Sequence, residues 1–160
     1  MIRKVLVFEP KKCIGCRLCE ATCVMTHFNV TNPEKARIRI IRDPNLQMDL
    51  AFYCHQCSKP PCVDACKFNA LSINPDTHAI IVNQENCVAC RACIQMCPHG
   101  AIQMDPTSEH VLICTTCEGN PACVKICPEK AIQYVNIERA DHVYKSTLVE
   151  VMAQNTKQND

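Results

Sequence analysis

The residues of this sequence best suited to chemistry are its 16 cysteines, in a chain of 160 residues. A protein so rich in cysteine is usually either a disulfide scaffold or a metal or cluster protein of a reducing compartment. Every cysteine belongs to one of four quartets, and none is left over. The quartets are Cys13, Cys16, Cys19 and Cys23; Cys54, Cys57, Cys62 and Cys66; Cys87, Cys90, Cys93 and Cys97; and Cys114, Cys117, Cys123 and Cys127.

The spacing inside the quartets is typical of iron–sulfur clusters. In the third quartet two residues separate each of the first three cysteines, three residues precede the fourth, and Pro98 follows. This is the bacterial ferredoxin run, in which the fourth cysteine ligates the other cluster of a pair. The first quartet differs only by Val24 in place of proline, and the second and fourth have wider middle spacings. Four such quartets predict four 4Fe–4S clusters.

Zinc and disulfide bonds are the alternatives to clusters. All-cysteine zinc sites usually join two C-x2-C pairs about 12–20 residues apart, and the separation of Cys57 from Cys62 is too short for that. A secreted disulfide protein would need a signal peptide with an apolar stretch of roughly 7–15 residues, whereas the N-terminal apolar run covers only residues 5–8. No run of about 18 apolar residues occurs either. We therefore expect a soluble cytoplasmic protein with no membrane anchor of its own.

Charge and composition exclude several other functions. The formal net charge is +1, and the concentrated basic face of nucleic-acid-binding proteins is missing from the pattern. Arg37, Arg39 and Arg42 alternate with isoleucines, which predicts the solvated face of a strand. The sequence has no nucleotide-binding loop, flavin site or catalytic triad. We therefore expect no nucleic-acid partner, and we expect substrate chemistry to lie on another chain.

Internal repeats predict an α+β fold of short elements. After the second, third and fourth quartets, residues 67–73, 98–104 and 128–134 each predict a tight turn followed by a short strand. Turns at 74–76 and 105–108 then predict two small hairpins. The three-residue spacing before each fourth cysteine suits one helical turn, because residues i and i+4 share a helix face.

Two further segments lie outside the repeats. Residues 36–41 predict an extended stretch, followed by a loop that contains proline. The apolar residues of 137–153 follow a helical period. We expect that helix to pack on its own domain, with docking to another subunit as the alternative, and a polar tail to follow it.

The first two quartets resemble one particular family. Residues 13–23 and 53–66 are similar to the four-cluster iron–sulfur subunits of the dimethyl sulfoxide reductase type. That family includes electron-transfer subunits of formate dehydrogenases, formate hydrogenlyase, carbon monoxide dehydrogenase-linked hydrogenase and aldehyde oxidoreductases. The resemblance covers residues 1–136 and is to the compact cytoplasmic members. The chain departs from the family at Lys67, where members usually have proline, and we expect this to alter a local turn but not ligation.

The resemblance implies two pseudo-symmetric ferredoxin-like halves around four clusters. One half would be residues 1–30 with 110–136, the other 50–109, and residues 137–160 would be the C-terminal helix and tail. Quartets would pair first with fourth and second with third. The implied ligand sets are Cys13, Cys16, Cys19 and Cys127; Cys23, Cys114, Cys117 and Cys123; Cys54, Cys57, Cys62 and Cys97; and Cys66, Cys87, Cys90 and Cys93.

The implied function is electron transfer within a larger oxidoreductase. We expect the catalytic partner to be a tungsten- or molybdenum-pterin enzyme such as an aldehyde oxidoreductase, and a flavoprotein subunit or a ferredoxin as a further partner. One alternative keeps the clusters and changes the partner to a hydrogenase or carbon monoxide dehydrogenase. Another is a free polyferredoxin with no permanent partner.

Positively charged side chains within the cysteine loops are candidates for tuning the clusters. Arg17, Arg91 and His55 lie there, and a nearby positive charge favours the reduced cluster and raises its potential. The alternative is that they are solvated loop residues. The other histidines have no ligand spacing and are predicted to be structural or on the surface; they are His27, His78, His99, His110 and His142.

Overall fold

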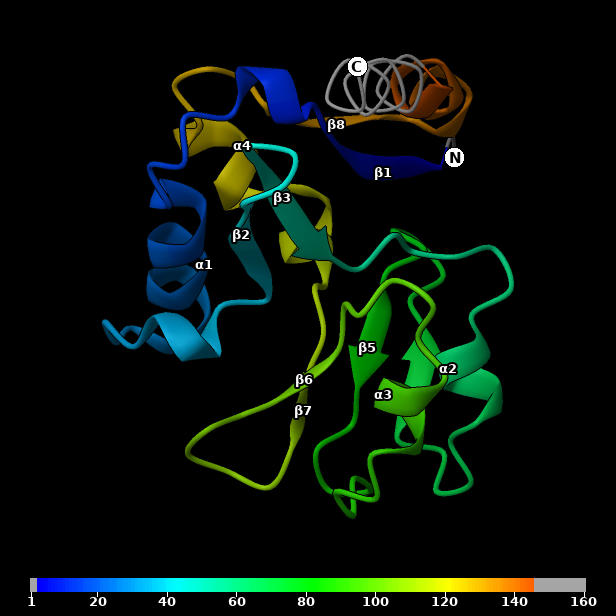
Figure 1. Ribbon diagram of the computed structural model, residues 1–160. Coiled ribbons are helices and arrows are strands. Elements are labelled where there is room, and N and C mark those ends of the chain that lie inside the picture. The colour runs from blue at the N-terminus through cyan, green and yellow to red at the C-terminus, as the bar shows by residue number, and fades with distance from the viewer. Residues whose placement is uncertain (1–2, 146–160) are drawn as a thin grey trace.

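Short helices and paired strands, separated by cysteine-bearing loops, make up residues 3–145, which the computed structural model of the chain describes (Figure 1). The strands form antiparallel pairs: β1 (Lys4–Phe8) with β8 (Ile132–Asn136), β2 (Ile38–Asp43) with β3 (Met48–Tyr53), β4 (Leu71–Ile73) with β5 (Ile80–Val82), and β6 (Gln103–Met104) with β7 (Val111–Leu112). The helices are α1 (Leu18–Phe28), α2 (Pro61–Asp64), α3 (Ala92–Gln95) and α4 (Ala122–Ile126), with 3-10 turns η1 (Pro10–Lys12), η2 (Pro33–Lys35) and η3 (Thr116–Gly119). This mixture agrees with the predicted α+β class.

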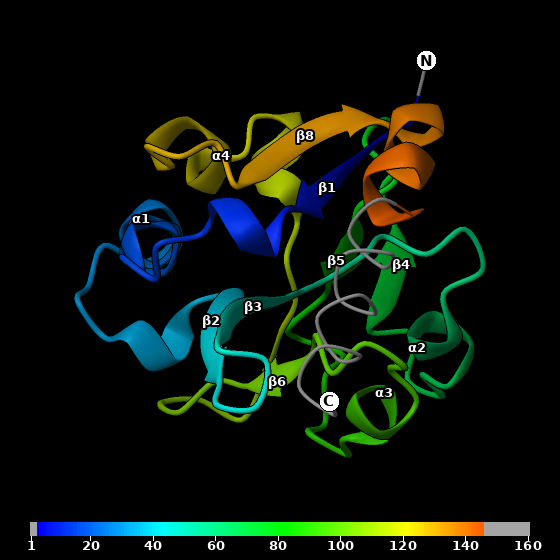
Figure 2. The same ribbon diagram turned by 45° about the horizontal axis from the view of Figure 1, so that its top comes forward.

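The β1–β8 pair joins the two ends of the described chain. Leu6 lies opposite Tyr134, and Phe8 opposite Ile132. Val5, Leu6 and Val7 are almost completely buried, so this ribbon is held by apolar packing as well as by its backbone hydrogen bonds. In Figures 1 and 2 the two strands lie side by side, with α1 and α4 near one end of the ribbon and α2 and α3 in another part of the molecule. The ribbon thereby brings the first and fourth quartets together.

The repeated segments after the quartets share one turn. In each, the third residue after the fourth cysteine has a left-handed backbone, and its N–H donates to the carbonyl of that cysteine. An alanine follows, buried at the start of the strand region. The residue pairs are Asn69 and Ala70, Gly100 and Ala101, and Lys130 and Ala131. The internal repeat read from the sequence is therefore a structural repeat, and the second repeat forms it although Lys67 replaces proline.

Both small hairpins predicted from the sequence are present. Asn74 opens the turn between β4 and β5, where its side-chain oxygen accepts the N–H groups of Asp76 and Thr77 at 2.9 and 3.1 Å. Asp105 plays the same part between β6 and β7 by accepting the N–H of Thr107 at 2.8 Å. A third hairpin, β2–β3, was predicted only in its first strand. Its second strand, β3, has no alternating pattern as clear as that of β2.

The described part of the predicted C-terminal helix packs on its own domain. Residues 137–145 are helical, and the rest of the predicted span 137–153 lies outside the described residues. Ala140 is completely buried in a cluster with Val5 and Val7. The Tyr144 hydroxyl donates to the Leu6 carbonyl at 3.0 Å. Within residues 3–145 no helix is long and apolar enough to cross a membrane.

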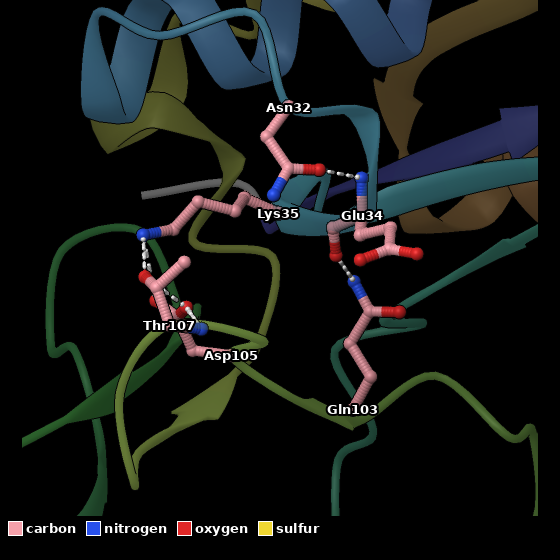
Figure 3. Close-up of polar contacts among 6 residues, drawn as sticks. All are labelled: Asn32, Glu34, Lys35, Gln103, Asp105 and Thr107. Carbon is pink, nitrogen blue, oxygen red and sulfur yellow. Dashed lines mark hydrogen bonds and ion pairs between the residues drawn. The ribbon is translucent and has the colours of Figure 1, made fainter.

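A polar contact fastens η2 to the β6–β7 hairpin (Figure 3). Lys35 Nζ lies 3.2 Å from a carboxylate oxygen of Asp105 and 2.5 Å from the Thr107 hydroxyl. Gln103 donates from its amide to the carbonyls of Glu34 and Ala36. Burial opposes ionisation of Asp105, but hydrogen bonds from Thr107 and Lys35 hold the pKa of its carboxyl below the usual value. Segments about seventy residues apart in the chain are therefore held together by charge as well as by apolar packing.

Replacing Lys35 by Met should cost about 1–3 kcal/mol of stability, because it leaves the buried Asp105 carboxylate without its cation. The matched control is Lys12→Met, which breaks the more exposed pair of Lys12 with Glu9 and should cost less than about 1 kcal/mol. Thermal unfolding of the intact protein, followed by circular dichroism, compares the two. Equal losses would show that the Lys35–Asp105 pair contributes no more than a surface pair.

Candidate iron–sulfur cluster sites

Two of the expected cysteine sets line hollows in the structure. One hollow is bordered by three thiols of the first quartet together with Cys127 from the fourth. The other is bordered by three thiols of the third quartet together with Cys66 from the second. In both, the fourth thiol comes from a different quartet, as in paired ferredoxin clusters. The thiols are Cys13, Cys16, Cys19 and Cys127 in the first hollow and Cys66, Cys87, Cys90 and Cys93 in the second.

The walls of these hollows suit a cubane cluster. Around the first, apolar side chains such as Phe8, Leu18 and Ile40 accompany the four thiols. A cluster is surrounded by its ligands, so it needs thiols spread around a volume and not converged on one atom. Among residues 3–145 no three His, Cys, Asp or Glu side chains gather closely enough to hold a single metal ion.

The remaining eight cysteines form two more groups, recognised by the influence of their charges on one another. Burial raises the pKa of the Cys123 thiol, and the charges of three cysteines of its group raise it further. Burial also raises the pKa of Cys62, and the charges of Cys97 and Cys57 add to the effect. The two groups are Cys23, Cys114, Cys117 and Cys123, and Cys54, Cys57, Cys62 and Cys97.

The four groups form a series of neighbours, here called the line, which runs from the group of Cys13 through those of Cys23 and Cys54 to that of Cys66. Neighbouring groups are indicated by a cysteine in one group whose charge acts on a cysteine of the next. Cys16 and Cys90, in the two outer groups, are exposed, whereas the inner Cys54 and Cys114 are buried. The line therefore begins and ends near the surface. The linking pairs are Cys19 with Cys123, Cys114 with Cys54, and Cys62 with Cys93.

Burial of the thiols makes cluster binding and folding interdependent. It raises the pKa of Cys54 and of Cys114 to about 12, and that of Cys93 to about 11. Such thiols stay protonated at neutral pH unless a positive ion is bound, and iron binds the thiolate. These buried sulfur atoms are therefore costly to ionise without the metal, and iron binding must release their protons.

Helices position the third cysteine of every quartet and relate it to the fourth. Cys19, Cys62, Cys93 and Cys123 are each the second residue of a helix, α1, α2, α3 and α4 respectively. The predicted helical turn between the third and fourth cysteines is complete only in α1, which contains both Cys19 and Cys23. In the other three quartets the fourth cysteine lies one or two residues beyond the end of the helix.

Left-handed backbone shapes the loops before these helices, although the chain has only three glycines. Arg17 and Arg91 have φ of 57° and 63°, and Cys117 and Glu118 have φ of 48° and 56°. A non-glycine residue in this region costs roughly 1–2 kcal/mol. These strained residues therefore shape the cysteine loops at positions where the chain has no glycine.

Backbone N–H groups donate directly to three fourth-position sulfur atoms. The Ala70 N–H lies 3.3 Å from Cys66 Sγ, and the Ala101 N–H lies 3.4 Å from Cys97 Sγ. Both alanines belong to the repeated turn. In the first quartet, which lacks that turn, the donor to Cys23 Sγ is Arg37, at 3.3 Å. Hydrogen bonds to ligating sulfur are a principal means by which a protein sets cluster potential.

Gln56 connects the two inner groups and was missed by the sequence analysis. Its side chain is completely buried; it donates to the Cys114 carbonyl at 2.7 Å and accepts the Ile80 N–H at 2.9 Å. Arg3 donates to its carbonyl. Nothing in the pattern distinguishes this glutamine from a solvated loop residue, because its partners lie in distant segments.

His27 and Arg37 lie beside the group that contains Cys117. His27 Nε2 is 3.5 Å from Cys117 Sγ, and burial, followed by the Arg37 charge, lowers the pKa of His27 to about 4. Arg37 donates to the Thr115 hydroxyl at 3.2 Å. The prediction that Arg37 belongs to a solvated strand face is wrong: it precedes β2 and turns into the protein. His27 remains a structural histidine, but one in contact with a candidate ligand.

The three tuning candidates named from the sequence differ in their surroundings. Arg17 and Arg91 are exposed, so solvent and salt screen their charges. His55 is partly buried and stacks between Tyr53 and His99, with ring centroids 4.9 and 4.1 Å away. Burial, followed by the proximity of His99, lowers the pKa of His55 to about 4. At neutral pH His55 therefore contributes packing and no charge.

Comparison with known proteins places these features in context. Residues 46–137 match the family model described as 4Fe-4S dicluster domain. Over 117 residues, 72% of this chain and 66% of the relative, the sequence is 42% identical to the aliphatic sulfonate oxidoreductase, polyferredoxin-like subunit, of Pyrococcus furiosus. It is 34% identical to electron transport protein HydN of Escherichia coli over 110 residues, 64% of this chain and 61% of HydN. The chain thus spans somewhat less than two thirds of these curated relatives.

A solved structure supports the fold. The active site complex BamBC of benzoyl coenzyme A reductase, in complex with benzoyl-CoA, contains a chain that superposes with a TM-score of 0.51 over the whole length of both chains. The two sequences are 20% identical. At that identity the similarity concerns the fold.

The first and third quartets offer a test of loop strain. Gly15, φ 67°, and Ala89, φ 55°, occupy equivalent places. A Cβ on Gly15 would lie 3.0 Å from the carboxylate of Asp49, which pairs with Arg42. Gly15→Ala should therefore cost about 1–2 kcal/mol, whereas Ala89→Gly should change stability by less than about 1 kcal/mol.

The measurement is thermal unfolding of the holoprotein for both variants and for the double variant Gly15→Ala, Asp49→Ala. Asp49→Ala alone is the reference for the double variant. Because Asp49→Ala removes the clash, adding Gly15→Ala to it should cost much less stability than Gly15→Ala costs in the wild-type protein. Additive losses would exclude contact with Asp49 as the reason for glycine at position 15.

Proposed function

The chain belongs to the 4Fe-4S dicluster domain family. From that membership and from its sixteen cysteines in four quartets, we propose that it holds four [4Fe–4S] clusters and transfers electrons to or from the catalytic subunit of an oxidoreductase. The observation that carries the proposal is the pair of hollows, each bordered by three thiols of one quartet and one of another. Clusters of this kind supply reversible one-electron transfer. The relatives named polyferredoxin-like subunit and electron transport protein support the same role.

We assign one cluster to each group of four thiols. The two outer clusters would be held by Cys13, Cys16, Cys19 and Cys127 and by Cys66, Cys87, Cys90 and Cys93. The two inner clusters would be held by Cys23, Cys114, Cys117 and Cys123 and by Cys54, Cys57, Cys62 and Cys97. The chain's own part is to keep these groups in line, to exclude water from the buried inner thiols, and to present Cys16 and Cys90 near the surface as entry and exit.

The two ferredoxin-like halves remain our proposal for the domain organisation. Residues 1–30 with 110–136 would form one half, and residues 50–109 the other. The packing of α1 against α4, and of α2 against α3, supports it. β6 and β7 pair across the boundary at residue 109, so the halves share a hairpin.

For the partner we propose a cytoplasmic tungsten- or molybdenum-pterin enzyme such as an aldehyde oxidoreductase, with a flavoprotein subunit or a ferredoxin completing the path. The resemblance of residues 13–23 and 53–66 to subunits of such enzymes supports this choice, and the similarity to a subunit of an oxidoreductase agrees with it. A hydrogenase or carbon monoxide dehydrogenase is the second candidate.

The single variants Cys13→Ala and Cys127→Ala should each lack the same cluster and should each lose about one quarter of the bound iron. The double variant should lose no more iron than either single variant, because both thiols border one hollow. The control pair, Cys13→Ala with Cys97→Ala, should lose about half. Iron analysis and electron paramagnetic resonance (EPR) of the anoxically purified protein provide the measurement. Loss of about half of the iron from the first double variant would contradict the crossed ligand sets.

Anoxic purification of tagged protein from its native host should recover a large second chain together with tungsten or molybdenum. Elemental analysis and mass spectrometry of the eluate provide the measurement, and an untagged strain is the control. Nickel in place of those metals would favour a hydrogenase or carbon monoxide dehydrogenase. Iron alone, with no second chain, would contradict the subunit role and leave a free polyferredoxin.

A further inference from the structure

Arg37 is a partly buried cation at the inner group that contains Cys23, Cys114, Cys117 and Cys123. Its backbone N–H donates to Cys23 Sγ at 3.3 Å, and its guanidinium donates to the Thr115 hydroxyl, next to Cys114, at 3.2 Å. The guanidinium also lies 5.4 Å from the ring centroid of Phe28. Its Nε is buried without a hydrogen-bond partner.

The charge of Arg37 has no carboxylate partner within ion-pair distance among residues 3–145. Lys35 provides the contrast, because it lies 4.9 Å from the same Phe28 ring but is paired with Asp105. A desolvated charge is costly unless an opposite charge compensates it. Arg37, Cys117 and Glu118 border the same hollow, so negative charge on the sulfur of this group lies close to Arg37. In agreement, burial raises the pKa of the Cys23 thiol and the Arg37 charge opposes that rise.

The outer group beside it has two carboxylates close to its thiols. Glu20 is buried next to Cys19 and accepts the Ile40 N–H at 2.5 Å. Burial, and then the charge of Glu20, raise the pKa of Cys19 to about 12. Burial raises the pKa of Cys13 as well, and the charge of Asp49, which is itself paired with Arg42, adds to that rise. Glu20 therefore has no cation within ion-pair distance among residues 3–145, whereas Arg37, at the adjacent inner group, has no carboxylate there.

On the basis of the proposed function, we propose that the fixed charge of Arg37 raises the reduction potential of one inner cluster, the one held by Cys23, Cys114, Cys117 and Cys123. The reduction potential of that cluster then lies above that of the neighbouring outer cluster. Reduction of this cluster adds one electron, hence one unit of negative charge, and makes or breaks no bond. The electron comes from a low-potential one-electron donor, either the oxidoreductase partner or the neighbouring outer cluster. A cation beside the ligands in a partly desolvated site stabilises the reduced form more than the oxidised form. This inner cluster therefore retains an electron that enters through the outer cluster next to Cys16.

The test is a reductive titration of the anoxically purified holoprotein, monitored by EPR, for Arg37→Gln, Arg37→Lys and Arg39→Gln. Arg39 is the matched control, because it is a partly exposed arginine only two residues further along the chain, within β2. In Arg37→Gln the equilibrium constant for reduction of one cluster should fall about tenfold, which for a one-electron couple lowers its reduction potential by about 59 mV. The other clusters should stay unchanged, Arg37→Lys should recover much of the shift, and Arg39→Gln should cause little.

The shifted cluster is identified with Cys117→Ser, which alters the spectrum of the cluster next to Arg37. In the double variant with Arg37→Gln, the altered component should be the one that moves. If all clusters are present and none shifts, or if Arg39→Gln shifts the same component equally, the role of Arg37 is overturned. If the wild-type protein itself lacks clusters, the proposed function fails instead, and iron analysis of each sample separates the two outcomes.

Discussion

Thiols from opposite ends of the chain must meet around the same hollow, and the rest of the structure depends on this constraint. Cys127 borders the hollow formed by Cys13, Cys16 and Cys19. No local segment can bring these residues together, so the β1–β8 ribbon and the packing of α1 against α4 must do it. Both are built from apolar side chains, of which Leu6 and Val7 are completely buried. The crossing in the middle of the chain, between Cys66 and the third quartet, needs only the short β4–β5 hairpin.

The apolar core is built around the cysteines. The strands of the described chain have two to six residues, and the main buried cluster mixes seven cysteines with aliphatic side chains. Left-handed residues in the loops, such as Arg17 and Cys117, add strain. Buried thiols with raised pKa values add a further cost when iron is missing. The energy that compensates these costs is that of thiolate–iron bonding, which makes cluster assembly and folding one process.

Polar contacts determine how the groups relate to one another electrostatically. Gln56 satisfies the Cys114 carbonyl and the Ile80 N–H at the centre of the line. The Lys35–Asp105 pair is neutral as a unit, whereas Arg37, two residues after Lys35, has no ion-pair partner among residues 3–145. Two cations near one Phe28 ring therefore have different consequences: one joins distant segments, and the other places positive charge beside sulfur.

The four quartets, the α+β class, the repeated turn and both small hairpins are predictable from local patterns, because each is encoded within a few neighbouring residues. The helical course of residues 137–145 is predictable as well, through their apolar period. The grouping of thiols was available only by resemblance to a family, since spacing alone does not say which fourth cysteine crosses to which loop. The surroundings of Arg37, His27 and Gln56, and the presence of strand β3, emerge only from the three-dimensional fold. Their partners lie in distant segments, and an arginine alternating with isoleucines has the same local pattern whether it faces water or a cluster ligand.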